Sequence, residues 1–337
     1  MPRLVERGYA VTAYNRIYPG QTKGADTYKG VDIVYHSTVK KSGIDTLLHS
    51  IKVTWHIIRK NEADIVHMQG NNALFAFILK LFGKKVVLSI DGVEWERDKW
   101  SWGMRKLVLA NAYLAVNSSK RIAIDNVFTR EIFEKKFNKK FHFISFGSEV
   151  NANAETDILS KLGLTAGGYF LFVGRFIPDK GLQYLIPAFE KVATDKKLVL
   201  VGGSPNPSEF EVNLKNTNDP RIVFPGFIYG DDTITLMKHC YAYTQPSDIE
   251  GLSPVMLSVM GLGTPLICSD IQENIYIVKE DAVLFRKSNI ESLVEALKFS
   301  LENREKHLEL AAAAKKRILQ EYSWNSITDK YIELFES

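Results

Sequence analysis

Hydrophobic and polar positions follow two alternating patterns along this chain. Short runs of β-branched and aromatic residues precede longer amphipathic stretches, which is typical of strand–helix units in a parallel sheet. In the first half the pattern predicts strands at 9–14, 31–35, 64–68, 85–90, 113–117 and 141–145. It predicts helices at 44–59, 73–81, 104–109 and 119–136.

The second half repeats this alternation. Strands are predicted at 169–173, 197–201, 222–224, 242–245, 265–268 and 283–285, and helices at 182–192, 232–239, 254–261, 290–301 and 305–321. A glycine and a polar Asn-Ala-Asn-Ala stretch at 147–154 separate the two halves. We therefore expect an α/β protein of two doubly wound domains, 1–150 and 151–321, followed by a terminal helix at 322–337.

The start of the chain departs from this pattern. A doubly wound domain normally begins with a strand, a glycine-rich turn and a helix. Here the segment PRLVERG reads as the last turns of a helix with Gly8 as its stop, and it runs directly into a strand. We expect that a first strand and its turn are absent from this sequence, and that the first domain is incomplete.

Composition places the chain among globular proteins. It has 337 residues, 45% hydrophobic and 24% charged, which excludes disordered and collagen-like classes. Its two cysteines, Cys240 and Cys268, lie in apolar runs far apart, as expected for buried thiols in a reducing compartment. The stretch 73–82 is too short to span a bilayer, and no secretory signal opens the sequence. We expect a cytoplasmic protein.

Charge is distributed unevenly between the halves. Residues 1–150 carry 24 Lys and Arg against 14 Asp and Glu, or +10, and the remainder carries 19 against 25, or −6. A basic half attracts anionic lipid headgroups or phosphorylated substrates. Solvated surface lysines explain the charge equally well, whereas scattered basic residues without a nucleic-acid motif argue against nucleic acid as a partner.

Two segments of the second half carry candidate chemistry. In FLFVGRFIPDKGLQYLIP, Gly174 ends a strand and a helix follows, so backbone amides together with Arg175 and Lys180 could hold a diphosphate. In QPSDIEGLSPVMLSVMGLGTPLIC, Glu250 and Gly251 lie just before a helix, at the sheet edge where ligands of such folds bind. Solvated cations and a capping acid are the structural alternatives.

Together these segments resemble the retaining nucleotide-sugar glycosyltransferases of family GT4. The strings GRFIPDKGLQYLI, EGLSPVML and GTPLICSDIQEN are similar to that family's C-terminal domain in order and spacing. In the first half, PRLVERGYAVTAYNR, DIVHMQGNNALFAFILKLFGKKVVLSIDGVEW and ERDKW are similar to the bacterial branch that includes polysaccharide rhamnosyltransferases. The resemblance implies the GT-B arrangement: two facing Rossmann-like domains, with a C-terminal helix crossing back onto the first.

The resemblance also implies roles for individual residues. Arg175 and Lys180 would hold the donor's diphosphate and stabilise the charge that develops on the leaving group. Glu250 would match the first acid of the family's Glu-x7-Glu motif, near the donor sugar. The donor-binding set that follows comprises Gly174, Arg175, Lys180, Glu250, Gly251, Leu252, Ser253 and Ser258.

Ser258 is the point at which the sequence departs from the family pattern. The second acid of the motif usually receives the ribose hydroxyls, and serine makes a shorter and uncharged hydrogen bond. A dTDP-sugar, whose deoxyribose has one hydroxyl fewer, would lose less, which favours dTDP-rhamnose as donor. Weaker donor binding, or substitution by Glu273, stays open as an alternative.

In the first half, Asp91 ends a strand where the family carries a His or Asp facing the reaction centre. It could accept the acceptor's proton or orient the acceptor, because in retaining chemistry the leaving phosphate itself can be the base. His67 ends another strand, and Glu94 and Arg97 follow Asp91, so these three are expected to bind the acceptor. His67 could equally be structural.

We expect no metal site and no cofactor other than the donor substrate. His49 and His56 lie seven residues apart, without metal-ligand spacing, and Arg175 and Lys180 already suit the diphosphate. Three tryptophans, Trp95, Trp100 and Trp102, could seat an acceptor sugar, enter a lipid interface or simply pack.

The sequence therefore predicts a glycosyltransferase on the inner face of the cell membrane. It would transfer a sugar, rhamnose from dTDP-rhamnose in the favoured reading, to a lipid-linked or growing polysaccharide. The alternatives are a UDP- or GDP-hexose donor, or an inactive fragment that still binds nucleotide. A dehydrogenase is disfavoured, since no G-x-G-x-x-G follows a predicted strand.

Overall fold

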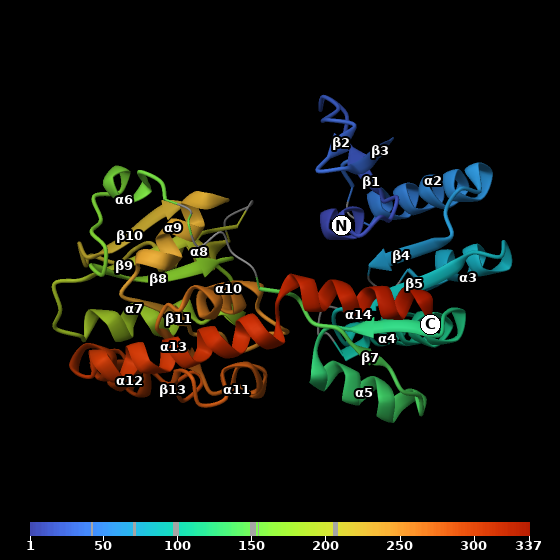
Figure 1. The fold of residues 1–337 in the computed structure, drawn as a ribbon. Helices are drawn as coiled ribbons and strands as arrows, with labels where there is room; N and C mark the ends of the chain where they lie inside the picture. Colours follow the sequence, from blue (N-terminus) through green and yellow to red (C-terminus); the bar gives the residue numbers. More distant parts are fainter. Residues whose placement is uncertain (42, 70–71, 97–100, 149–152, 154, 205–207) are drawn as a thin grey trace. The chain divides into compact units, whose positions relative to one another are not determined.

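The computed structural model describes residues 1–41, 43–69, 72–96, 101–148, 153, 155–204 and 208–337 (Figure 1). The chain divides into two compact units. Unit 1 comprises Met1–Ser145 with Asn325–Ser337, and unit 2 comprises Phe146–Trp324. The final segment of the chain therefore packs with the N-terminal residues, and each unit is described by itself below.

Unit 2 is built on a six-stranded parallel sheet in the order β10-β9-β8-β11-β12-β13. Its strands are β8 (Tyr169–Gly174), β9 (Lys197–Gly202), β10 (Ile222–Gly226), β11 (Ala242–Gln245), β12 (Leu266–Ser269) and β13 (Val283–Phe285). All six predicted strands are confirmed within two residues. The order reverses between β8 and β11, so a topological switch point lies between these two strands.

Alternation along the central strands sends side chains to two separate cores. Tyr169 and Leu171 pack on one face, with helices α9 (Asp231–His239), α10 (Pro254–Leu262) and α13 (Arg304–Glu321). Phe170 and Phe172 pack on the other, with α7 (Leu182–Glu190) and α12 (Ile290–Glu302). Because both faces are covered, these strands are apolar throughout, as parallel strands are.

Unit 1 contains a four-stranded parallel sheet in the order β4-β5-β6-β7. Its strands are β4 (Ile65–Gln69), β5 (Lys85–Ile90), β6 (Arg121–Ile124) and β7 (His142–Phe143). The core on one face includes residues of α3 (Ala73–Leu81), α4 (Trp102–Ser118) and α5 (Val127–Phe137). The terminal helix α14 (Trp324–Glu336) contacts residues of the opposite face, through Tyr331 and Phe335.

A second, smaller sheet opens the chain. It has the order β1-β3-β2, with β1 (Thr12–Ile17), β2 (Thr27–Tyr28) and β3 (Val31–Ser37), and it is followed by α2 (Ile44–Lys60). The predicted leading helix is confirmed as α1 (Pro2–Glu6), and Gly8 has φ +88°, as a helix stop requires. Within the described residues, β1 and β4 are edge strands that belong to different sheets.

The strand predicted at 113–117 is wrong, and the helix predicted at 119–136 begins only at Val127. Residues 113–117 continue α4, which runs to Ser118, and the strand is β6, inside the range predicted as helix. Ala112, Ala115 and Val116 are buried at helical spacing, which a reading of the apolar run alone misses. Asn126 then caps α5 by accepting a hydrogen bond from the Thr129 amide at 3.0 Å.

Several short elements were not predicted from the sequence. They are α6 (Ile158–Lys161), α8 (Glu209–Leu214), α11 (Gln272–Val278) and the 3₁₀ turns η1 (Glu94–Glu96) and η2 (Pro178–Lys180). Elements this short have little periodicity to reveal them.

The cysteines and the membrane-spanning helices can be checked in the described residues. Cys240 and Cys268 are both free and buried, as predicted, and burial raises the pKa of each thiol. Among the described helices, none is long and apolar enough to cross a membrane.

Candidate functional site

The predicted donor residues of unit 2 gather at its switch point. Arg175 directly follows β8, and Glu250 lies five residues after the end of β11. The loops after these two strands approach each other closely, because the amide of Asp248 donates a hydrogen bond to the carbonyl oxygen of Asp179 at 2.9 Å. Lys180 and Glu250, which are 70 residues apart in the sequence, thus lie together at one sheet edge.

Glu250 is held by three donors on a single oxygen. Its Oε1 accepts from Lys180 Nζ at 2.5 Å, from Gln245 Nε2 at 2.5 Å and from Ser247 Oγ at 2.6 Å. Its side chain is 7% exposed. A buried carboxylate needs such partners, since burying an unpaired charge costs several kcal/mol. The network fixes the orientation of the carboxylate and leaves Oε2 outside these hydrogen bonds.

A second layer supports the residues that hold Glu250. The hydroxyl of Tyr243 lies 3.0 Å from Gln245 Oε1, and the hydroxyl of Ser269 donates to the carbonyl oxygen of Ser247 at 2.5 Å. Asn274 Nδ2 in turn donates to Ser269 Oγ at 3.1 Å. The network therefore extends from β11 across β12 to α11, which rigidifies the site.

Gly181 permits the close approach of the two loops. Its φ is +72°, and a Cβ at this position would lie 1.9 Å from the carbonyl oxygen of Pro246. Gly202 shows the same feature at the end of β9, where a Cβ would lie 1.9 Å from the carbonyl oxygen of Gly174. Both positions require glycine for space as well as for conformation.

Arg175 and Lys180 differ in their surroundings. Arg175 is exposed, and the described part of the chain offers it no ion-pair partner. Lys180 is 19% exposed in its side chain and is already paired with Glu250. A diphosphate bound here would therefore meet one uncompensated cation and one whose charge is shared with a carboxylate.

The N-terminus of α10 lies directly after Glu250. Ser253 caps the helix by accepting from the Met256 amide at 3.3 Å, and Pro254 occupies the first turn. Within the described residues, the amides of Gly251 and Leu252 make no hydrogen bond to a protein acceptor. Their role in binding a donor sugar stays a prediction.

Ser258 lies one turn into α10. Its hydroxyl donates to the carbonyl oxygen of Pro254 at 2.9 Å, so its hydrogen-bonding proton is already used within the helix. As an acceptor its oxygen stays available, but it carries no charge.

Unit 1 places two carboxylates side by side at its own sheet edge. Asp91 follows β5 and is exposed, and Asp125 follows β6, the neighbouring parallel strand. Asp125 Oδ1 is buried and has no hydrogen-bond partner. Burial, and to a lesser degree the charge of Asp91, raises the pKa of Asp125 to about 7. Asp125 is therefore largely protonated at mildly acidic pH.

His67 belongs to a polar chain on the face of the sheet that α14 contacts. Its Nε2 lies 2.7 Å from Ser89 Oγ, which lies 3.0 Å from the hydroxyl of Tyr331. The ring also packs against Phe335, with centroids 5.8 Å apart. Loss of solvent around the imidazole lowers the pKa of His67. His67 thus has structural partners, which is the alternative that its sequence context left open.

The remaining predicted acceptor residues lie after β5. Glu94 begins η1, whereas Arg97 and Trp100 lie outside the described residues. Trp95 is buried against Phe133, with ring centroids 4.9 Å apart, so it serves packing. Trp102 is 73% exposed at the start of α4.

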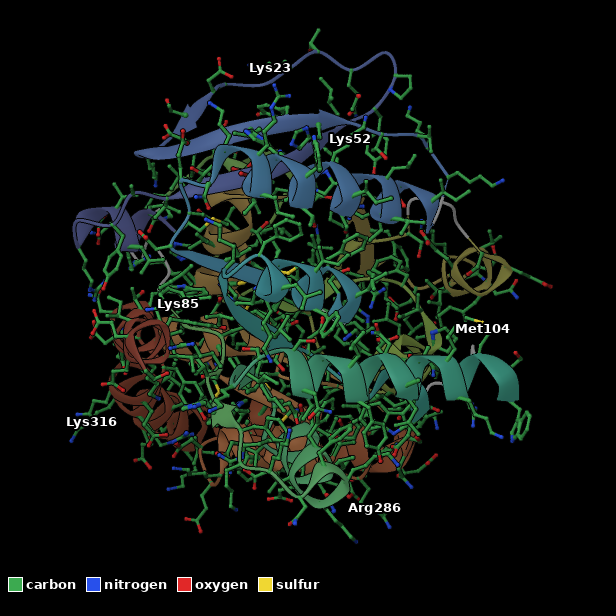
Figure 2. The ribbon with its side chains drawn as sticks, turned by 90° about the vertical axis from the view of Figure 1, so that its right-hand side faces the viewer. Lys23, Lys52, Lys85, Met104, Arg286 and Lys316 are labelled. Atoms are coloured by element: carbon green, nitrogen blue, oxygen red, sulfur yellow. The ribbon has the colours of Figure 1, made fainter. Side chains whose placement is uncertain are left out.

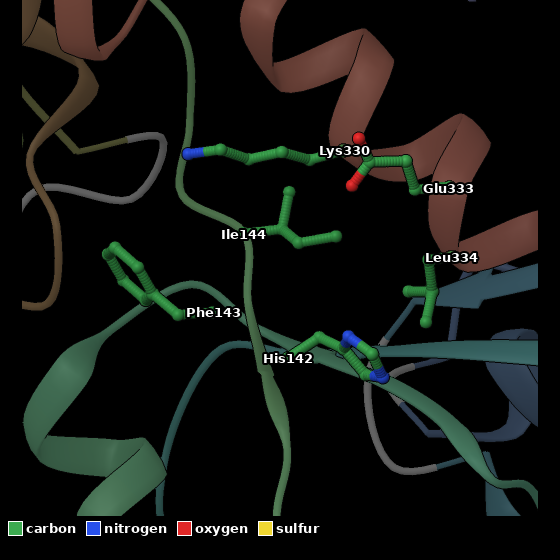
Figure 3. Close-up of a pocket in the computed structure, with 6 residues that line it drawn as sticks. All are labelled: His142, Phe143, Ile144, Lys330, Glu333 and Leu334. Atoms are coloured by element: carbon green, nitrogen blue, oxygen red, sulfur yellow. The ribbon is translucent and has the colours of Figure 1, made fainter. Parts of the chain in front are cut away.

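A pocket of about 210 Å³ lies elsewhere in unit 1, between α14 and the segment that includes β7 (Figure 3). Its lining is His142, Phe143, Ile144, Lys330, Glu333 and Leu334. None of the residues predicted for donor or acceptor binding lines it, so it is separate from both candidate sites.

Sequence reasoning missed three kinds of residue at these sites. Gln245 and Ser247 donate hydrogen bonds to Glu250. The sequence indicated them only by their place at the end of β11 and in the loop that follows. The close approach at Gly202 was signalled by a glycine pair after an apolar strand. Asp125 was missed because β6 was predicted as helix.

The described residues contain no group of three histidine, cysteine or acidic side chains arranged for a metal ion.

Comparison with known proteins identifies the class. Residues 156–317 match the family model described as glycosyl transferases group 1. An uncharacterized glycosyltransferase of Bacillus subtilis, YqgM, is 24% identical over 83% of this chain and 80% of its own length. O-antigen chain mannosyltransferase C of Escherichia coli is 26% identical over 60% of this chain and 56% of its own length.

A solved structure supports the same conclusion for the fold. The Anabaena protein HepE, in complex with UDP and glucose, has a TM-score of 0.79 and 16% identity, covering 97% of this chain and 99% of HepE. Taken with the match of residues 156–317 to the group 1 family model, these similarities show that the chain is a glycosyltransferase with the GT-B fold.

Proposed function

We propose that the protein transfers a sugar from a nucleotide diphosphate donor to a saccharide acceptor with retention of the anomeric configuration. The arrangement of Glu250 beside Lys180 at the switch point of unit 2 carries this proposal. A carboxylate with one oxygen fixed by three donors is preorganised to receive a sugar hydroxyl on the other. Arg175, exposed after β8, supplies a cation for the diphosphate.

In the reaction, the bond between the anomeric carbon and the diphosphate oxygen breaks, and a bond from the same carbon to the acceptor oxygen forms. Negative charge builds on the leaving diphosphate, where Arg175 and Lys180 stabilise it. The acceptor's proton passes to a diphosphate oxygen, and Asp91 orients the acceptor hydroxyl. Unit 2 thereby supplies the donor subsite and unit 1 the acceptor subsite.

We propose dTDP-rhamnose as the donor. Ser258 supports this choice, because its hydroxyl proton is used by Pro254 and it offers the ribose only a neutral acceptor. A deoxyribose has one hydroxyl fewer, so it needs fewer hydrogen bonds from position 258. The competing candidates are a UDP-hexose and a GDP-hexose. HepE was solved with UDP and glucose, and the Escherichia coli relative is a mannosyltransferase, so the neighbours of this chain do not all favour one donor.

We propose a lipid-linked or growing polysaccharide as the acceptor, at the inner face of the cell membrane. The net charge of +10 on residues 1–150 supports association with anionic lipid. The Escherichia coli relative, named for O-antigen chains, supports a polysaccharide product.

Calorimetric titration with dTDP, UDP, GDP and ADP tests the donor site. We expect selective binding of dTDP by the native chain and at least about tenfold weaker binding by Arg175→Ala, because charge-assisted hydrogen bonds are worth about 1.5–3 kcal/mol. Lys316→Ala removes an exposed cation on α13 and serves as the matched control. Failure of all four nucleotides to bind would overturn the proposal.

Turnover separates the second candidate from the first. A chain that binds nucleotide but transfers nothing is favoured by one observation: β1 and β4 are edges of separate sheets in unit 1. Incubation with the selected nucleotide-sugar and a saccharide acceptor, read by NMR, gives both turnover and the anomeric configuration of the product. A product with inverted configuration would refute the retaining mechanism. Absence of product despite tight binding supports the nucleotide-binding alternative, and restored turnover on adding upstream coding sequence would assign it to a missing first strand.

A further inference from the structure

The outward face of three helices in unit 1 is unusually apolar. On α2, Leu47, Ile51 and Trp55 are 50%, 47% and 65% exposed, and their spacing places them on one side of the helix. On α3, Leu74 and Leu81 are 52% and 69% exposed. We call this surface, together with the exposed residues of α4, the apolar helix face.

The α4 part of the apolar helix face is of the same kind. Trp102 and Leu107 are 73% and 62% exposed, and Met104 is 39% exposed. Helix α3 packs against both α2 and α4, so the three helices form one continuous layer. Figure 2 looks onto this layer, with α2, α3 and α4 one below another and with Lys52 and Met104 labelled.

A contiguous surface of this kind needs an explanation. Single exposed apolar residues are normal, but soluble monomers rarely expose apolar patches larger than a few hundred Å². In unit 2, by contrast, the exposed residue Val212 lies on α8, and Leu308 and Leu319 lie eleven residues apart on α13. The feature is therefore a property of one layer of unit 1 and not of the whole chain.

The charges on these helices indicate which kind of surface the layer could bind. The helices α2, α3 and α4 carry six cationic side chains, namely Lys52, Arg59, Lys60, Lys80, Arg105 and Lys106. They carry a single acid, Asp45, which is already paired with Arg16 Nη1 at 2.8 Å. An apolar stripe flanked by cations, with no unpaired acid on its helices, is complementary to a surface with an apolar interior and anionic headgroups.

The two tryptophans are suited to the same partner. Trp55 and Trp102 present an apolar ring with a polar N–H, which favours the boundary between headgroups and acyl chains. Lys106 Nζ lies 3.7 Å from the Trp102 ring centroid, so a cation accompanies this ring. A second protein would need its own apolar patch and acids to match, whereas a bilayer offers both chemistries everywhere.

We propose that the apolar helix face of α2, α3 and α4 docks unit 1 onto an anionic lipid bilayer. Trp55, Trp102 and the leucines enter the headgroup region, and the lysines and arginines contact lipid phosphates. The inference rests on the membrane association proposed above and assigns it to a surface. It is independent of the donor chemistry of unit 2.

Vesicle flotation of the full chain tests the proposal. The vesicles are phosphatidylcholine with and without phosphatidylglycerol, at low and high salt. We expect binding only to the anionic vesicles, weakened by salt. The variant Leu47→Ser/Ile51→Ser/Trp55→Ser should lower the partition coefficient at least about tenfold, because three partly inserted side chains are lost.

The matched control changes exposed apolar residues of unit 2. Val212→Ser/Leu308→Ser/Leu319→Ser removes side chains that are 53%, 44% and 46% exposed, and we expect it to float like the native chain. Nucleotide binding is measured for every variant, and unchanged affinity shows that the donor site and its proposed function are intact. Should the serine variant misfold, Arg59→Glu/Lys80→Glu/Lys106→Glu tests the same face by charge reversal, with loss of flotation expected.

Depth of insertion gives a second readout. Brominated phosphatidylglycerol should quench the fluorescence of the native chain, and Trp55→Phe/Trp102→Phe should abolish most of that quenching. The proposal is overturned if the native chain fails to float at low salt or if both face variants float normally. It is also overturned if light scattering shows a dimer that the serine variant dissociates, since a second copy would then cover the face.

Discussion

The two units treat a carboxylate at their sheet edge in opposite ways. In unit 2, Glu250 is buried, and three donors converge on one of its oxygens. In unit 1, Asp125 Oδ1 is buried without a partner, next to the charge of Asp91. The first arrangement satisfies a buried carboxylate with hydrogen bonds, whereas in the second, burial raises the pKa of Asp125.

This difference extends to the surfaces. In unit 2, Gly181 and Gly202 stand where a Cβ would lie 1.9 Å from a backbone carbonyl oxygen. Unit 1 exposes the apolar helix face, and its Asp91 is exposed at the sheet edge. Under the proposed function, the fixed site of unit 2 would suit a donor diphosphate, and the accessible acid of unit 1 would suit an acceptor. The experiments below test how far this contrast holds.

The largest effect is expected at the glycine that joins the two loops of unit 2. Gly181→Ala places a Cβ 1.9 Å from the Pro246 carbonyl oxygen and strains a φ of +72°, so we expect a loss of at least about 3 kcal/mol in stability, together with nucleotide binding. Gly251→Ala is the control for folding, because its Cβ would meet no heavy atom within 4 Å. Equal urea midpoints for the two variants would show that the loops are not held as tightly as described.

The next effect is the sensitivity of unit 2 to low pH. His307 is buried in unit 2, with Nδ1 2.8 Å from Ser300 Oγ and Nε2 donating to the Leu266 carbonyl oxygen at 3.1 Å. Burial lowers the pKa of His307 to about 4. The unfolded chain therefore takes up the proton first, and stability is lost as pH falls from about 6.5 to 4, by about 3 kcal/mol.

Urea unfolding between pH 8 and pH 4 measures this loss. The variant His307→Gln should lower stability at pH 8 but should flatten the dependence on pH. An unchanged slope in the variant would assign the acid sensitivity to another group.

A smaller effect tests the ion pair in unit 2. Lys180→Met removes one of three donors from a buried carboxylate, and we expect a loss of about 2 kcal/mol in stability. Adding Glu250→Gln removes the charge that needed Lys180, so the double variant should recover part of that loss. Additive losses in this cycle, measured by urea unfolding, would show that Gln245 and Ser247 alone satisfy Glu250.

The smallest effect concerns the carboxylate of unit 1. The pKa of Asp125 is raised to about 7, so the folded chain holds the proton more tightly and stability falls as pH rises from about 4 to 7. Since the residue is partly exposed, we expect Asp125→Asn to stabilise the protein by about 1–2 kcal/mol at pH 8 and by little at pH 4. Asp91→Asn should lower the pKa of Asp125, which carbon-detected NMR can follow; no shift would place the two carboxylates too far apart to interact.

Much of the fold follows from local pattern. The six strands of unit 2 could be predicted because both sides of a parallel sheet are covered, which makes each strand a short apolar run between turns. In unit 1 the same reasoning failed at 113–117, where an apolar run belongs to a helix buried along Ala112, Ala115 and Val116. Short apolar runs carry no period that separates the two cases.

The candidate site shows the same limit. Arg175, Lys180 and Glu250 could be singled out from their loops, and their roles remain predictions. That Lys180 and Glu250 pair with each other could not be read from a separation of 70 residues. Trp95 and Trp102 look alike in sequence, yet one is buried against Phe133 and the other is 73% exposed.

The alternation of strands and helices, the charge asymmetry and the loops with candidate chemistry can be recognised in the amino-acid sequence, because they depend on neighbours along the chain. Four other features emerge only in the folded chain. They are the strand order with its switch point, the three donors on Glu250, the unpartnered Oδ1 of Asp125 and the continuity of the apolar helix face. Each of these depends on the packing of elements distant in sequence, which sets both solvent access and the partners available to a polar group.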